Sequence, residues 1–190
     1  MLYNIVAFLF IVSFYYAGLK FPDIDFKLRN FGITHRSMLT HSFFVPAFLM
    51  LLNAKGILGI YWQRRYDISG IIIVSFSVGI IMHLLYDLFP KKFAGTALIQ
   101  IPFFQAALKK SQTVAWILAS CIILTGISVF YPMTMFNIAT FIACIVLTLC
   151  FKKNEENGFY AVAILFAVIF FLAAYFRNDY VDFIIKFFYF

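Results

Sequence analysis

Charged residues are scarce in this sequence of 190 residues: they make up 12% of it, and only eight residues are acidic. Hydrophobic residues make up 64% and the mean hydropathy is +0.96, whereas soluble domains are roughly half apolar. This composition excludes an ordinary soluble domain and predicts an integral membrane protein. The formal net charge of +7 does not indicate nucleic-acid binding, because the basic residues occur in twos and threes between apolar runs, as charges that flank membrane segments do.

Cysteine is also sparse. Cys121, Cys144 and Cys150 all lie in apolar runs, their number is odd, and no CxxC spacing occurs, so neither a disulfide framework nor a cysteine-ligated metal site is predicted. The first apolar run, residues 2–19, has no basic segment before it and no clear small-residue cleavage site. We therefore expect this run to be a membrane helix and not a removable signal peptide.

Six apolar runs approach the length of about 20 residues that a bilayer core of roughly 30 Å requires. They cover residues 2–19, 41–60, 68–89, 114–131, 133–151 and 159–176. The fourth and fifth share a turn at Pro132, which favours an antiparallel pair. The pattern predicts an all-α integral membrane protein with about six transmembrane helices, forming a single membrane domain over residues 1–190. Residues 1–112 are expected to carry the site, and residues 113–190 to form a helical second half.

The distribution of basic residues predicts the orientation. With six crossings, the first, third and fifth loops share ten basic residues and the opposite side has five. The positive-inside rule then predicts an inner-membrane protein with both termini outside and these three loops in the cytoplasm. Residues 90–112 have an apolar centre between two lysine pairs, so we expect an interfacial or re-entrant segment, in which Pro102 argues against one straight helix. The aromatic tail, residues 179–190, is expected to lie on the surface.

All three histidines lie in segments that this topology brings to one membrane face. The segments are the loop after the first helix, the start of the second helix and the end of the third, and they carry Asp23, Asp25, His35, Arg36, Thr40, His41, Ser42, His83 and Asp87. Charged groups near lipid are costly, so a cluster of them indicates a function. We therefore predict that the three segments meet in one pocket on the cytoplasmic side.

His83 and Asp87 are four residues apart, and such side chains point the same way from a helix. Together they form a candidate metal-binding pair. Ser75 and Gly79 continue the same spacing, and small residues allow another helix to approach closely. This stripe predicts that the pair faces the bundle and not the lipid.

Structural roles remain open for each of these groups. His83 and Asp87 could form a plain hydrogen-bonded pair, and Asp23 and Asp25 could cap a turn after Pro22. Arg36 could pair with an aspartate or bind a phosphate or carboxylate group, while Thr40 and Ser42 fit hydroxyl groups at a helix start. The convergence of so many groups favours a divalent metal ion, zinc or manganese, with Asp23, Asp25, His35, His41, His83 and Asp87 as candidate ligands.

Two classes of function follow from such a site. The first is a metal-dependent hydrolase at the cytoplasmic interface that acts on a phospholipid or another amphiphilic ester, with membrane lipid as its partner. In it Asp23 would act as general base and Arg36 would bind the substrate. The second is a non-catalytic scaffold, or a small transporter that handles protons or metal. The absence of a broken span or repeat in the sequence argues against transport.

Four motifs carry a resemblance to a known family: "PDID", "HRSMLTHS", "HLLYD" and "GTALIQIP", within about residues 21–102. With these motifs the chain resembles the YdjM-like family, described as LexA-binding, inner-membrane-associated, metal-dependent hydrolases. The resemblance implies a multi-helix membrane protein in which the six candidate ligands form the site, with Arg36, Thr40 and Ser42 as supporting groups. The LexA-binding description belongs with the scaffold alternative and a protein partner, which the sequence does not identify.

Overall fold

The structure, a computed structural model, describes residues 2–31, 33, 35–62, 66–89, 98–104, 106–151 and 157–177. Within these ranges the chain is mostly helical, as expected. The expected surface segment at residues 179–190 lies outside the described residues, as do residues 90–97 of the expected interfacial segment.

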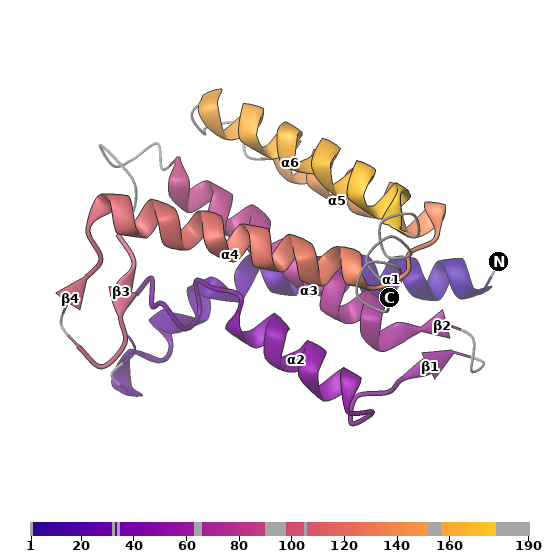
Figure 1. Cartoon of the computed structure of the whole chain (residues 1–190), viewed down its shortest axis with the longest axis horizontal. Helices are drawn as coiled ribbons and strands as arrows, with labels where there is room; N and C mark the ends of the chain where they lie inside the picture. The colour runs from indigo at the N-terminus through magenta and orange to yellow at the C-terminus, as the bar shows by residue number, and fades with distance from the viewer. Residues whose placement is uncertain are drawn as a thin grey trace, which may run out of the picture.

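The described residues form six α-helices, which pack as a bundle (Figure 1). They are α1 (Leu2–Lys20), α2 (Phe44–Ala54), α3 (Ile68–Leu88), α4 (Lys110–Phe130), α5 (Met135–Phe151) and α6 (Asn157–Tyr175). Two 3-10 turns follow α1, η1 (Pro22–Phe26) and η2 (Arg29–Phe31). Two short antiparallel hairpins complete the described elements, β1 (Tyr61–Trp62) with β2 (Tyr66–Asp67) and β3 (Gln100–Ile101) with β4 (Ala106–Ala107).

Among the described helices, three, α1, α3 and α4, are long and apolar enough to cross a membrane, which is compatible with a membrane protein. The expected span over residues 41–60 differs most from the structure. Only the centre of this span is helical. Helix α2 has 11 residues and is therefore about 16 Å long, at a rise of about 1.5 Å per residue. Gly56 stops the helix with a φ of 74°, a left-handed conformation that glycine adopts without a steric penalty.

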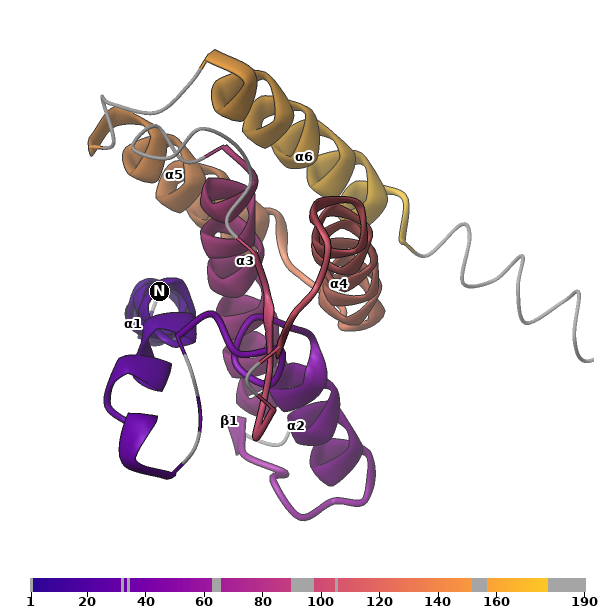
Figure 2. The same ribbon diagram turned by 90° about the vertical axis from the view of Figure 1, so that its left-hand side faces the viewer.

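Helix α3 is the centre of the bundle and is buried along most of its length, with α1 and α4 as its main neighbours (Figure 2). Glycines allow α1 and α3 to touch. A Cβ atom on Gly79 would overlap the backbone oxygen of Tyr15, and one on Gly18 would overlap that of Phe76. Ser75 is fully buried on the same stripe, so the prediction that this stripe faces the bundle is confirmed.

The helices alternate in direction between two ends of the bundle. At the end where α1 and α3 finish, called the site end below, the Leu19 carbonyl lies 2.9 Å from Nδ1 of His83. Helix α4 begins there, and its Trp116 indole donates to the backbone oxygen of His41 at 3.2 Å. At the opposite end α4 turns into α5, as expected from Pro132.

Both ends of the described chain lie at this opposite end. The start of α1 is held by Asn137, whose amide donates to the Tyr3 hydroxyl at 3.3 Å near the start of α5. After α6, the Arg177 guanidinium donates to the backbone oxygen of Phe130 at the end of α4. The fold therefore places the candidate site at one end of the bundle and both described chain ends at the other.

Candidate metal site

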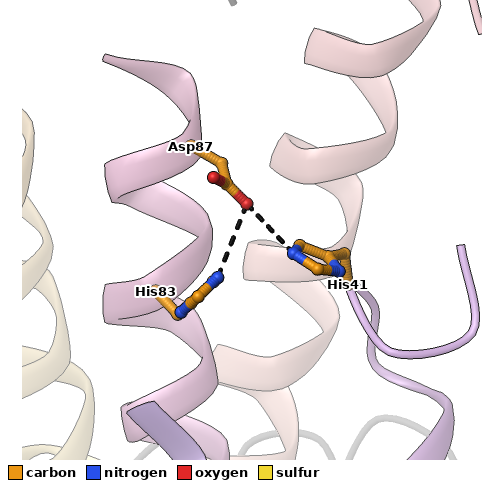
Figure 3. A group of neighbouring side chains, drawn as sticks. All are labelled: His41, His83 and Asp87. Carbon is orange, nitrogen blue, oxygen red and sulfur yellow. Dashed lines mark ion pairs between the residues drawn. The ribbon is translucent and has the colours of Figure 1, made fainter. Parts of the chain in front are cut away.

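Three side chains, His41, His83 and Asp87, point toward one another at the site end and are called the triad below (Figure 3). Each offers one ligand atom, and the three atoms lie within 4.8 Å of one another. Oδ2 of Asp87 is 3.3 Å from Nε2 of His41 and 3.6 Å from Nε2 of His83. Ligands about 2.1 Å from a tetrahedral ion are roughly 3.4 Å apart, so this buried cluster could hold a metal ion.

The backbone of α1 determines which nitrogen of His83 is available. Nδ1 lies 2.9 Å from the carbonyl oxygen of Leu19, and a carbonyl only accepts. Nδ1 therefore carries the proton, and Nε2 presents its lone pair toward Asp87. This is the usual arrangement of a metal-binding histidine, in which the second ring nitrogen donates to a fixed acceptor.

The loop before α2 provides the partners of Nδ1 of His41, whose side chain is fully buried. Its Nδ1 lies 3.1 Å from the Thr40 hydroxyl and 3.4 Å from Oδ2 of Asp25. When the Thr40 hydroxyl hydrogen is directed to Asp25 or to the backbone oxygen of Ser37, its oxygen can accept from Nδ1 of His41. Nε2 of His41 is then left with a lone pair directed at the triad.

Two ligand atoms of the triad are buried without a well-aligned hydrogen bond. Within the described residues, Nε2 of His41 and Oδ2 of Asp87 face each other at 3.3 Å as an ion pair, but neither atom has a well-aligned hydrogen bond. A buried polar atom without a partner costs about 1–3 kcal/mol, and more when it is charged. A cation between these atoms would remove that cost, and this is the strongest structural indication of a metal site.

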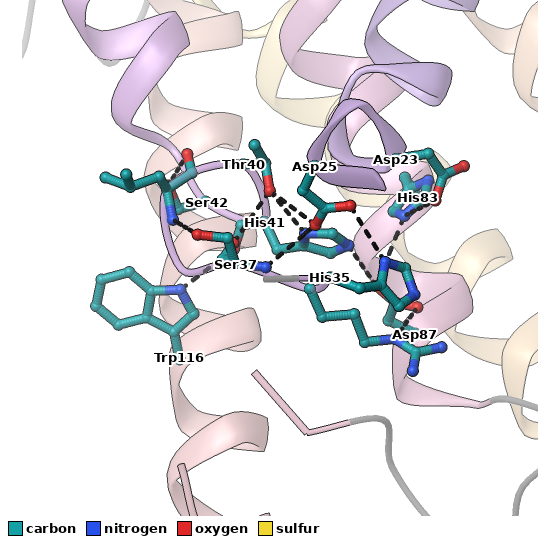
Figure 4. A network of polar contacts seen from close by, with 12 residues as sticks. Asp23, Asp25, His35, Ser37, Thr40, His41, Ser42, His83, Asp87 and Trp116 are labelled. Atoms are coloured by element: carbon teal, nitrogen blue, oxygen red, sulfur yellow. Dashed lines mark hydrogen bonds and ion pairs between the residues drawn. The ribbon is translucent and has the colours of Figure 1, made fainter. Parts of the chain in front are cut away.

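Asp25 and His35 lie beside the triad and not within it. The fully buried Asp25 accepts hydrogen bonds from the Ser37 amide at 3.1 Å and the Thr40 hydroxyl at 3.2 Å, and His35 contacts it at 3.1 Å (Figure 4). The ring centroids of His35 and His41 are 6.2 Å apart. Asp25 therefore orients the loop that carries His41.

Asp23 lies at the open edge of the triad. Its Oδ1 is 3.9 Å from Nε2 of His83, and 43% of its side chain is exposed. A carboxylate that is close to the ligand atoms and in contact with solvent is well placed to complete the coordination or to accept a proton from water.

Arg36 connects the triad to the β3–β4 hairpin. Its Nε lies 3.5 Å from Oδ1 of Asp87, and its φ of 58° is left-handed, which is uncommon for a residue other than glycine. The backbone N–H of Gln100 donates to the backbone oxygen of Arg36 at 2.8 Å, and the backbone N–H of Met38 donates to the backbone oxygen of Gln100 at 2.9 Å. The hairpin thus holds Arg36 in a conformation that costs of order 1–3 kcal/mol.

The segment expected to be interfacial or re-entrant therefore forms this hairpin where it is described. Gln100 was missed as a residue of the site, because nothing in the local sequence predicts its pairing with Ser37. Trp116 was missed as well, since it lies in the second half of the chain yet holds the backbone of His41. Ser42 lies just before α2, whose N-cap residue is Phe43, and its hydroxyl accepts from the Phe44 backbone amide at 3.3 Å.

Comparisons of the chain with protein-family models, with curated proteins and with solved structures found no match.

Proposed function

We propose that this protein is a metal-dependent hydrolase of the inner membrane that acts at the cytoplasmic interface on a phospholipid or another amphiphilic ester. The observation that supports it best is the triad, in which Nε2 of the buried His41 lies 3.3 Å from Oδ2 of Asp87 and has no well-aligned hydrogen bond within the described residues. Mixed imidazole and carboxylate ligation suits zinc or manganese. Asp23 adds a solvent-exposed carboxylate at the same point.

The proposal includes six membrane crossings, with both termini outside and the site at the cytoplasmic face. The alternating helix directions support it, because they place Tyr3 and Arg177 at the end opposite the triad. Helix α2 has 11 residues and is too short to cross alone, so the second crossing would depend on non-helical backbone that is covered by protein or reached by water. The β3–β4 hairpin would lie at the headgroup level.

A bound divalent ion would supply an acidic water molecule and polarise the ester oxygen. Asp23 would accept a proton from the water, whose oxygen forms the new bond to phosphorus or to the acyl carbon. The bond to the alcohol oxygen breaks, and the alcohol leaves with a proton. Arg36 would bind the charge that develops on the substrate oxygens. Membership of the YdjM-like family is part of this proposal and rests on the motifs quoted above.

Metal analysis of the purified protein tests the site. We expect stoichiometric metal in the parent and none above background in His83→Ala and Asp87→Ala, because each loses one of three ligands. Asp67→Ala is the matched control, since this aspartate lies at the other end of α3. We also expect the metal-loaded parent to cleave a lipid phosphoester. A parent without metal would overturn the proposal, and metal without metal-dependent cleavage would favour the scaffold or transporter.

A further inference from the structure

A cavity of about 400 Å³ lies next to the triad, between the η1–η2 loop and strand β3. Arg29 and Phe26 line it from the loop, Arg36 and His35 from the turn before α2, and Gln100 from the hairpin. Its volume is in the range of small-molecule binding sites. Two of these five side chains are guanidinium groups, which bind phosphate through paired N–H donors.

Arg36 joins the cavity to the triad. Its side chain lines the cavity, while its Nε lies 3.5 Å from Oδ1 of Asp87. Asp25, the acidic residue in the cavity wall, is fully buried and accepts hydrogen bonds from the Ser37 amide and the Thr40 hydroxyl. The hydrogen bonds to this carboxylate reduce its repulsion of an anion in the cavity.

The charge balance of this region changes sign when a divalent ion is present. Three carboxylates, of Asp23, Asp25 and Asp87, face two guanidinium groups, of Arg29 and Arg36, which leaves an excess of negative charge if the histidines are neutral. A divalent cation in the triad turns this into an excess of positive charge. An anion is therefore attracted to the cavity of the metal-loaded protein and repelled from that of the metal-free protein.

We propose that this cavity is the phosphate-binding subsite of the substrate, formed by Arg29 and Arg36, and that it binds phosphate only when the triad holds a metal ion. The inference rests on the proposed function and narrows its substrate class to phosphate esters. The phosphate group would come from a lipid headgroup or from a soluble phosphate ester.

Titration calorimetry with inorganic phosphate on the purified full chain tests this, with the protein in detergent and either loaded with manganese or treated with a chelator. We expect binding to the loaded protein and at least about tenfold weaker binding after chelation. Arg36→Ala should weaken binding at least about tenfold and Arg29→Ala about three- to tenfold, the range for loss of one charge-assisted contact. Lys27→Ala is the matched control, because Lys27 is an exposed cation of the same loop that does not line the cavity.

Manganese content, measured on every sample, separates this inference from the proposed function. A parent that binds no metal overturns both, whereas a parent that binds metal but no phosphate overturns only the anion subsite. Equal losses of phosphate affinity in Arg29→Ala and Lys27→Ala would also overturn the anion subsite, because they would show a general effect of positive charge. Stronger competition by phosphatidic acid micelles than by glycerol phosphate would assign the subsite to a lipid headgroup, and equal competition to a soluble ester.

Discussion

Helix α3 carries an aspartate at each end, and the two side chains have different surroundings. At its start, Oδ1 of Asp67 accepts a hydrogen bond from the Gly70 amide at 2.8 Å, which caps the helix. At its end, Oδ2 of Asp87 is buried, has no well-aligned hydrogen bond within the described residues, and faces the imidazoles of His41 and His83 at 3.3 and 3.6 Å. A carboxylate is favourable near the positive end of a helix dipole and unfavourable near the negative end. Asp67 therefore stabilises its helix, whereas Asp87 depends on the positive charge around it, which the Arg36 guanidinium supplies at 3.5 Å from Oδ1 and to which a bound metal ion would add.

The comparison teaches that residue type alone does not identify a site. Both aspartates lie at the ends of one apolar helix. The free backbone N–H groups at the helix start are available to Asp67, whereas those near Asp87 are already bonded within the helix. Asp87 instead faces the Nε2 atoms of His41 and His83.

The response of stability to metal should separate the two aspartates. Removing the metal should lower the free energy of unfolding of the parent by about 2.7 kcal/mol if the metal was at 100 times its dissociation constant. Asp87→Ala should show no response to metal or chelator. The free energy of unfolding of Asp67→Ala should be about 1 kcal/mol lower, because the helix cap is missing, and the variant should keep the full response to metal. Unfolding in detergent, with and without chelator, measures both, and a metal response in Asp87→Ala would contradict the assignment of the triad.

Asp25→Asn should weaken metal binding about 10- to 100-fold without abolishing it, the usual cost of removing a group that orients a metal ligand. The new amide would place a donor opposite the Ser37 amide or the Thr40 hydroxyl, so the loop that holds His41 would shift. A metal titration gives the affinity. Asp67→Asn should leave the metal affinity within about twofold of the parent value, because Asp67 and the triad share no partners. Complete loss of metal in Asp25→Asn would show that Asp25 is itself a ligand.

Tyr131→Phe should have the smallest effect, a loss of about 1 kcal/mol in the free energy of unfolding and no change in metal affinity. The Tyr131 hydroxyl accepts from the Asn53 amide at 3.2 Å at the opposite end of the bundle, so the variant removes one hydrogen bond far from the triad. Denaturation and metal titration on the same preparation check this. A weaker metal affinity in this variant would mean that the two ends are coupled, and the comparison above would fail.

Much of the architecture could be predicted from the chain because the relevant signals are local. Apolar runs located the six helices to within a few residues, except for α2, where the left-handed Gly56 and the hydrogen-bonded turn at Thr40 shorten the helix. The four-residue spacing of Gly79, His83 and Asp87 located the inward face of α3. Helix periodicity and hydropathy depend on neighbouring residues, so both can be read directly from the sequence.

The sequence by itself predicted a mostly helical chain, the positions of every helix but α2, and the set of groups that could hold a metal. Only the tertiary structure decided that His41, His83 and Asp87 converge while Asp25 and His35 lie beside them. It also decided that Gln100 and Trp116 hold the backbone of Arg36 and His41. The physical reason is that a metal site depends on distances of a few ångströms between atoms of different segments. Those distances follow from backbone turns, ring orientations and the close contact of α1 with α3, which no local pattern of residues records.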